Sequence, residues 1–404
     1  MGLNETPSGD RLHIAILGKR NVGKSSLLNA ITNQEMAVVS DYKGTTTDPV
    51  RKTMELLPIG PVVLLDTPGV DDEGELGQKR IAQTKKALRE TDIALYVVDC
   101  VEGVCELDQL WIEDIKKREI PFLLIYNKAD LGISDAMVKQ IQEEQGIALS
   151  TSDCQAVHEL RERIAKLPLL EKEKSILLSD IVKPLWQVVL VVPIDDAAPK
   201  DRLILPQQQV IRDILESGAV SMVVRDTELE MFLLQMEKKP DLVITDSQAF
   251  QEVAKVVPQE VPLTSFSILM ARKKGYLKTA VSGVLALETL KDGDRILIAE
   301  GCTHHRQCMD IGTVKLPGWI AEYTKKDIQF DFCSGKDYSD MLHQYKLVIH
   351  CGGCMLNERE VMQRMKDAEK QGVPFTNYGI AIAYMNGILK RSIQMLPEIM
   401  ECMN

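Results

Sequence analysis

Residues 12–32 read LHIAILGKRNVGKSSLLNAIT, and this stretch decides the fold of the N-terminal part of the chain. The apolar run HIAIL is typical of a buried strand, and the amphipathic run SSLLNAIT is typical of a helix. The loop between them fits the P-loop pattern G-x-x-x-x-G-K-[ST], as Gly18-Lys19-Arg20-Asn21-Val22-Gly23-Lys24-Ser25. Because a strand precedes the pattern and a helix follows it, the sequence predicts a nucleotide phosphate site on an α/β sheet.

The residues of this loop have separate expected roles. Backbone N–H groups wrap the phosphates at the helix N-terminus, where glycine allows a close approach. Lys24 is expected to reach the β- and γ-phosphates, and the Ser25 hydroxyl is expected to hold Mg²⁺. The nucleotide-binding residues predicted in this loop are Gly18, Asn21, Val22, Gly23, Lys24, Ser25 and Ser26.

Two switch motifs follow the P-loop. In Asp66-Thr67-Pro68-Gly69, which ends the apolar run PVVLLD, Asp66 is expected to hold Mg²⁺ through water and the Gly69 N–H to sense the γ-phosphate. The first switch loop belongs between these motifs, at Gly44-Thr45-Thr46-Thr47-Asp48, and Thr46 is expected to complete the Mg²⁺ shell. The residues predicted to serve hydrolysis are therefore Lys24, Thr46, Asp66 and Gly69.

A base-reading motif ends the apolar run PFLLIYN, at Asn127-Lys128-Ala129-Asp130. The Asp130 carboxylate can accept both N1–H and N2–H of guanine, and adenine cannot supply this pair of donors. Loss of such a bidentate charged contact costs several kcal/mol in order of magnitude, so the motif predicts GTP over ATP.

These motifs resemble the TrmE–Era branch of translation-factor-type GTPases, and the match covers residues 11–155. The resemblance implies that Ser150 and Thr151 form the last base-contacting loop. Val70 stands where Ras has its water-orienting Gln, which predicts hydrolysis that is slow or assisted in another way. Asn21 matches the P-loop Asn that helps to hold K⁺ in potassium-activated relatives, although it could instead only shape the loop.

The chain of 404 residues is long enough for two to four domains, and 45% of it is hydrophobic. Strand-like runs alternate with amphipathic segments throughout, as in parallel sheets covered by helices. We predict an α/β protein of three domains: a Ras-like P-loop GTPase domain and two smaller α/β domains with mainly parallel sheets. The predicted ranges are 1–167, 183–262 and 265–404, with a polar linker around 168–182.

Composition and charge limit the cellular location and the classes of partner that we expect for the protein. No apolar run is long enough to span a bilayer, and MGLNETPSGD at the start has no signal-peptide pattern, which favours a cytoplasmic protein away from membranes. The net charge of −11 argues against nucleic acid as a partner. The basic run ARKKGYLK at 271–278 is interpreted as a solvated loop. Disulfides are not expected among nine cytosolic cysteines.

A second candidate site lies in the C-terminal third, at Cys302-Thr303-His304 and His350-Cys351-Gly352-Gly353-Cys354. Each group follows a strand-like run, RILIAEG or KLVIH. Because the carboxyl ends of neighbouring parallel strands meet at one edge, the two groups can converge. Three thiolates and two imidazoles suit a closed zinc site with four ligands or an iron–sulfur cluster on three thiolates. The residues alone leave this choice open, and the remaining cysteines are expected to be ordinary thiols.

The metal motif behind a GTPase domain, together with EGCTHH, HCGGCMLNERE and PFTNYGIAIAYMNGIL, resembles the HydF family of [FeFe]-hydrogenase maturation GTPases over essentially the whole chain. The resemblance implies a [4Fe–4S] cluster on Cys302, Cys351 and Cys354. It places His304 and His350 nearby, as exchangeable ligands or supporting groups. It also implies that the middle domain forms a homodimer and that the last domain binds the cluster.

The function implied by this resemblance is that of a scaffold and carrier. Such a protein receives a di-iron precursor from radical-SAM maturases and delivers it to apo-[FeFe]-hydrogenase, while GTP times the exchange of partners. One alternative is an RNA- or ribosome-associated TrmE–Era-type GTPase with a structural zinc site. Another is a redox protein whose cluster carries electrons.

Overall fold

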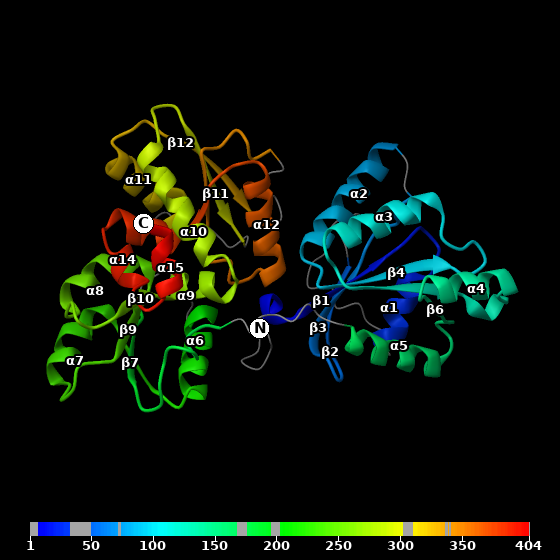
Figure 1. Cartoon of the computed structure of the whole chain (residues 1–404), viewed down its shortest axis with the longest axis horizontal. Coiled ribbons are helices and arrows are strands. Elements are labelled where there is room, and N and C mark those ends of the chain that lie inside the picture. Colours follow the sequence, from blue (N-terminus) through cyan, green and yellow to red (C-terminus); the bar gives the residue numbers. More distant parts are fainter. Residues whose placement is uncertain are drawn as a thin grey trace. The chain divides into compact units, whose positions relative to one another are not determined.

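The computed structural model describes residues 7–32, 50–71, 74–167, 176–194, 203–301, 310–335, 338 and 341–403. The chain divides into two compact units, Met1–Lys172 and Glu173–Asn404 (Figure 1). No helix in the described ranges is long and apolar enough to cross a membrane. The predicted α/β class is confirmed, with a P-loop domain first and two mainly parallel sheets after it.

The first unit is built on a six-stranded sheet with the order β2-β3-β1-β4-β5-β6. All pairs are parallel except β2 with β3. The strands are β1 (Leu12–Leu17), β2 (Val50–Leu56), β3 (Gly60–Asp66), β4 (Ile93–Asp99), β5 (Phe122–Asn127) and β6 (Ile147–Ala148). The helices are α1 (Lys24–Thr32), α2 (Gly74–Arg89), α3 (Glu106–Lys117), α4 (Asp135–Glu143) and α5 (Cys154–Lys166).

Both faces of this sheet are buried, because successive side chains of a strand point to opposite sides. Ile14 and Ile16 of β1 share a core with apolar residues of α1 and α5. Ala15 and Leu17 share a different core with residues of α2, α3 and α4. The Arg161 side chain of α5 donates to the backbone oxygens of Ala30 and Ile31 at 3.2 and 2.7 Å, which anchors the end of α1 opposite the P-loop.

The second unit contains two four-stranded sheets, and every strand pair in both is parallel. The first sheet has the order β10-β9-β7-β8 and the second has the order β12-β11-β13-β14. The first consists of β7 (Gln187–Val191), β8 (Val220–Val224), β9 (Leu242–Thr245) and β10 (Leu263–Ser265), with α6 (Leu205–Glu216), α7 (Leu229–Gln235), α8 (Phe250–Val256) and α9 (Phe266–Lys273).

The second sheet carries the cysteine motifs at its edge. It consists of β11 (Arg295–Glu300), β12 (Gln329–Ser334), β13 (Leu347–His350) and β14 (Phe375–Asn377). Its helices are α10 (Leu277–Gly283), α11 (Leu316–Thr324), α12 (Glu358–Lys370), α13 (Tyr378–Met385), α14 (Leu389–Ser392) and α15 (Pro397–Met400).

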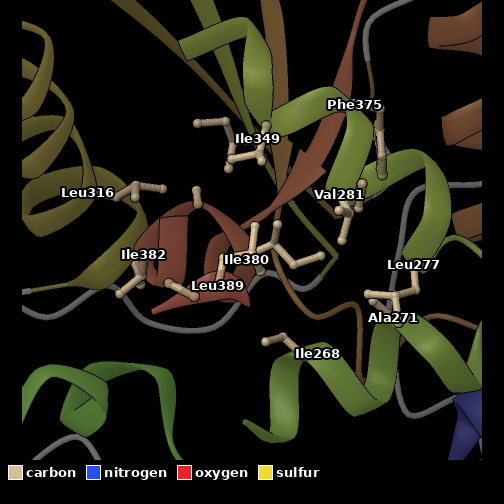
Figure 2. Close-up of a cluster of buried hydrophobic side chains, with 14 of the residues drawn as sticks. Ile268, Ala271, Leu277, Val281, Leu316, Ile349, Phe375, Ile380, Ile382 and Leu389 are labelled. Atoms are coloured by element: carbon tan, nitrogen blue, oxygen red, sulfur yellow. The ribbon is translucent and has the colours of Figure 1, made fainter. Parts of the chain in front are cut away.

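One hydrophobic core joins the two sheets of this unit. Figure 2 shows part of it, with Ile268 and Ala271 from α9, Ile380 from α13 and Ile349 from β13 in the same cluster. The same cluster includes Val189 and Val243 of the first sheet. The Arg391 guanidinium of α14 adds polar contacts across the junction by donating to the backbone oxygens of Ala254, Val257, Pro258 and Val261.

Two expectations need correction within this unit. Residues Leu177, Leu178 and Val182 of the expected linker are buried in a core with β7, so this part of the chain belongs to the folded unit.

The basic run at 271–278 is not a solvated loop. Arg272 forms a bidentate ion pair with Asp180, and Lys274 is buried. The strand β10 falls across the predicted limit at 262–265, and the three domain limits stay a prediction.

Candidate functional site: a P-loop and a cysteine loop

The P-loop follows β1, and α1 begins at Lys24. Gly18 and Gly23 have φ of +140° and +93°, a backbone conformation that favours glycine. A Cβ at Gly18 would lie 2.2 Å from the Val97 oxygen, and one at Gly23 would lie 2.2 Å from Asn127 Nδ2. The two glycines therefore let the loop pass close to the ends of β4 and β5. Lys24 Nζ folds back over the loop and donates to the oxygens of Gly18 and Lys19 at 2.9 and 2.6 Å.

The predicted magnesium pair is brought together. Ser25 Oγ donates to Asp66 Oδ2 at 2.6 Å, across 41 residues of sequence. Burial raises the pKa of the Asp66 carboxyl, and the Ser25 hydroxyl and the Lys24 ammonium partly oppose this rise. The second oxygen, Asp66 Oδ1, is buried without a hydrogen-bond partner in the described part of the chain. A buried, unsatisfied carboxylate oxygen beside a hydroxyl suits a hard divalent cation such as Mg²⁺.

The segment after Asp66 is anchored on β1. Thr67 Oγ1 donates to the Ile16 oxygen at 2.8 Å. Val70 is 1% exposed and packs in the same core as Ala15 and Leu17. A valine side chain has no polar group to orient water, and slow or assisted hydrolysis stays a prediction.

The base-reading motif lies beside the P-loop at the end of β5. Asn127 Nδ2 donates to the Val22 oxygen at 2.9 Å, and Lys128 Nζ pairs with Asp99 at 2.7 Å. The Ala129 N–H donates to the Leu149 oxygen at 3.2 Å, which brings the loop with Ser150 and Thr151 next to the motif. Asp130 is exposed in the short 3₁₀ turn Ala129–Leu131, so its carboxylate is accessible to a base.

Asn21 has a φ of 60°, in the left-handed region where Asn is better tolerated than most residues. This conformation gives direct support to a loop-shaping role. The potassium role stays a prediction.

The loop with Thr46, and the residues Cys302 and His304, lie outside the described residues.

The cysteine loop follows β13 at the edge of the second sheet of the C-terminal unit. β11 and β13 are neighbours in register, with Ala299 opposite His350, and the Cys351 N–H donates to the Ala299 oxygen at 2.8 Å. Cys351 Sγ accepts hydrogen bonds from the N–H groups of Gly301 at 3.0 Å and Gly353 at 3.3 Å. The residue that precedes Cys302 therefore touches the sulfur of Cys351.

Glycine permits this close approach of the two strand ends. A Cβ at Gly301 would lie 2.8 Å from the Leu356 side chain and 3.4 Å from Gly353 Cα. Gly353 has a φ of 61°, which turns the chain between the two cysteines. Within the described ranges, no group of three or more His, Cys, Asp or Glu side chains could hold a metal ion.

Sequence reasoning missed a buried lysine under the cysteine loop. Lys274 lies between α9 and α10, and its Nζ donates to the backbone oxygens of Gly353 and, at 2.9 Å, Leu356. Burial raises the pKa of the Cys351 and Cys354 thiols, whereas N–H donors to Cys351 and the Lys274 charge near Cys354 act in the opposite direction. The basic run at 271–278 predicted positive charge in this region, but nothing in its pattern predicted that Lys274 is buried.

His350 is completely buried, and both of its ring nitrogens have partners. Nδ1 lies 2.7 Å from the Cys351 oxygen, and Nε2 lies 3.2 Å from Nη1 of Arg364 on α12. Burial and the Arg364 charge lower the pKa of His350 to about 3, so the ring is neutral. A neutral ring that donates through Nδ1 and accepts at Nε2 fits these contacts. These contacts tie His350 to the cysteine loop and to α12, and its role toward a cluster stays a prediction.

Arg364 is the largest fully buried side chain of the described residues. Its guanidinium also pairs with Glu360 at 2.6 Å and donates to the Gly335 oxygen. The helix α12 is capped by Asn357, whose Oδ1 accepts from the Glu360 N–H at 3.0 Å. Arg364 and its partners therefore hold α12 and the end of β13 together behind the cysteine loop.

Different protein families match the two units of the chain. Residues 13–128 match the family described as 50S ribosome-binding GTPase, which makes the first unit a GTPase domain. Residues 177–275 match the hydrogen maturase F dimerization domain, and residues 278–395 match the hydrogen maturase F tetramerization domain.

Individual curated relatives match less than half of the chain. The tRNA modification GTPase MnmE of Aquifex aeolicus is 34% identical over 164 residues, which covers 40% of this chain and 36% of that protein. GTPase Der of Wolinella succinogenes is 39% identical over 145 residues, covering 35% of this chain and 30% of that protein. The chain thus spans about a third of the length of these curated relatives.

A solved complex of Era with MgGDPNP and nucleotides 1506–1542 of 16S ribosomal RNA has a TM-score of 0.33 and 19% identity, covering 55% of this chain and 93% of that chain. The two hydrogen maturase F matches together take up more than half of the chain and follow a GTPase domain. The chain therefore belongs to the hydrogen maturase F family.

Proposed function

We propose that the chain is a GTP-hydrolysing scaffold and carrier for the maturation of [FeFe]-hydrogenase. It holds a [4Fe–4S] cluster, receives a di-iron precursor from radical-SAM maturases and delivers the precursor to apo-hydrogenase in the cytoplasm. The observation that carries this proposal is the hydrogen bond from the Gly301 N–H to Cys351 Sγ. This contact brings the chain that leads into Cys302 to the cysteine loop of a hydrogen maturase F domain.

The GTPase role is assigned to the residues around the P-loop. Lys24 binds the phosphates, Ser25 and Asp66 hold Mg²⁺, and the Gly69 N–H meets the γ-phosphate. Asn127 and Asp130 read guanine, with Ser150 and Thr151 beside the base. The buried Asp66 oxygen and the hydrogen bond from Asn127, the last residue of β5, to the P-loop support these assignments.

The cluster role is assigned to Cys302, Cys351 and Cys354. Thiolates that accept backbone N–H groups, as Cys351 does from Gly301 and Gly353, suit an iron–sulfur cluster because these donors stabilise its negative charge. The buried Lys274 ammonium adds a positive charge next to Cys354. When bound, such a cluster on three thiolates leaves one iron able to accept an exchangeable group.

The oligomer role is assigned to the edge of the first sheet of the C-terminal unit, with a second copy of the chain as its occupant. β8 is the last strand of that sheet, and its Val220 and Val223 are each 46% exposed. Met231 and Leu234 of α7 are 61% and 75% exposed. An edge strand presents unpaired backbone groups and can pair with another chain. The family match of this region to a dimerization domain supports the assignment.

For guanine recognition, we expect Asp130→Asn to weaken GTP binding by about 100-fold, because the amide can no longer accept both donors of guanine. The same change should improve binding of xanthosine triphosphate, whose C2 oxygen can accept from the new amide. Titration calorimetry with GTP, ATP and xanthosine triphosphate measures both effects. Asp135→Asn, at an exposed position on α4, is the control. Unchanged preference for GTP over ATP in Asp130→Asn would refute the assignment.

For potassium, we expect GTP hydrolysis to be faster in K⁺ than in Na⁺ at equal ionic strength. Asn21→Gly separates the two roles of Asn21, because glycine keeps the left-handed backbone and removes the amide. The variant should bind nucleotide normally and lose the response to K⁺. A full response to K⁺ in Asn21→Gly would leave Asn21 with a loop-shaping role only.

For the cluster, we expect Cys302→Ala, Cys351→Ala and Cys354→Ala each to abolish bound iron and sulfide after anaerobic reconstitution. Each variant should also lose the ability to activate apo-hydrogenase and should keep its rate of GTP hydrolysis. Iron and sulfide analysis, the visible spectrum and a GTPase assay measure these properties, with Cys402→Ala as control. Colourless wild-type protein with stoichiometric zinc, or equal loss of hydrolysis in the variants, would contradict the proposal.

For the oligomer, we expect Val223→Lys to halve the molecular mass measured by sedimentation, because a desolvated lysine opposes pairing of the β8 edge with a second copy. Val101→Lys is the matched control, since Val101 is 63% exposed and lies in the GTPase unit. The same mass for Val223→Lys and for the wild type would rule out the β8 edge as the contact.

A further inference from the structure

The acidic side chain after the second switch motif rests on the P-loop. The Arg20 N–H donates to Asp71 Oδ1 at 2.8 Å, although the two residues lie 51 positions apart. The Val70 N–H lies 3.4 Å from the Gly18 oxygen. A Cβ added to Gly69 would lie 2.4 Å from Arg20 Cγ and 2.9 Å from Asp71 Oδ1. Residues 69–71 therefore lie directly against the loop.

The location of this contact relates it to the terminal phosphate. Backbone N–H groups of a P-loop are the donors that nucleotide phosphates use. Gly69 is the residue assigned to the γ-phosphate, and a Cβ there would be 3.1 Å from the Arg20 nitrogen. The Arg20 N–H, Gly69 and the Asp71 carboxylate therefore meet at one place. A carboxylate is an anion with the same acceptor chemistry as a phosphate oxygen.

The Lys19 side chain of the P-loop makes contacts that do not involve residues 69–71. Lys19 Nζ pairs with Glu102 at 3.0 Å and lies 3.9 Å from the buried Asp108 carboxylate. Asp108 in turn accepts from Tyr96 Oη at 2.9 Å and from the Cys105 N–H at 2.9 Å. Because these contacts fix the loop on β4 and α3, a repulsion between Asp71 and a phosphate would displace the Asp71 segment and leave the P-loop in place.

We propose that Asp71 is a positioning residue that senses the γ-phosphate. In the absence of this phosphate, the Asp71 carboxylate occupies the Arg20 N–H and holds the second switch segment on the P-loop. GTP brings a second anion to the same place and expels the carboxylate, which releases residues 69–71 from the P-loop. GDP has no phosphate there and leaves the contact intact. This inference rests on the proposed GTPase function and adds the group that couples nucleotide state to the switch.

Two substitutions separate charge from hydrogen bonding. Asp71→Asn keeps an acceptor for the Arg20 N–H and removes the negative charge, whereas Asp71→Ala removes both. We expect the ratio of the Kd for a non-hydrolysable GTP analogue to the Kd for GDP to fall by about tenfold in both variants, because the repulsion is gone. The Kd for GDP should change little in Asp71→Asn. Titration calorimetry on the full chain with Mg²⁺ measures these ratios, and Asp135→Asn is the control.

The possible outcomes are distinct. A lower ratio in both variants supports the inference, because a purely structural contact would be preserved in Asp71→Asn. A ratio in Asp71→Asn equal to that of the wild type overturns it, as does a proportional loss of affinity for both nucleotides. Failure of the wild-type protein to bind either nucleotide would instead refute the proposed function, and the two failures can thus be told apart.

Discussion

The hydrogen bond from the Gly301 N–H to the Cys351 thiol is the contact on which the C-terminal site depends. It exists because β11 and β13 are adjacent parallel strands whose register sets Ala299 opposite His350, so both leave the sheet at the same edge. Glycine at 301 favours it, since a Cβ there would lie 2.8 Å from the Leu356 side chain, which would have to shift. The Gly301 N–H thereby meets the sulfur of Cys351, which lies 50 positions later in the sequence.

Buried charges behind the cysteine loop give this edge its electrostatic character. Lys274 Nζ holds two backbone oxygens of the loop, and Arg364 binds His350 from α12. Desolvated cations are costly unless they are paired or hydrogen-bonded, and both of these side chains have hydrogen-bond partners. Their positive charge favours thiolates and the net negative charge of a cluster that thiolates bind. These two side chains therefore support the proposed cluster site without being assigned as its ligands.

Short sequence motifs predicted the GTPase motifs well, whereas long-range contacts and some secondary structure could not be predicted from the sequence. The P-loop, DTPG and NKAD motifs are short, and each follows a strand whose apolar run is visible in the sequence, so their place in the fold could be read directly. Lys274 and Asp71 could not be predicted in the same way, because their partners lie 79 and 51 positions away. The edge strand β2, VRKTMEL, has too many polar residues to resemble a buried strand. Residues 177–182 looked polar enough for a linker, and only the tertiary structure reveals that Leu177, Leu178 and Val182 fill a core.

We propose that Cys302, Cys351 and Cys354 bind one iron–sulfur cluster at the shared edge of β11 and β13. The most direct test of this proposal is a crystal structure of the anaerobically reconstituted protein, with iron located by anomalous scattering at its absorption edge. We expect an iron signal within bonding distance of all three sulfurs. A Cys302 sulfur that points away from the other two, or an anomalous signal from zinc between Cys351 and Cys354, would rule out the shared cluster.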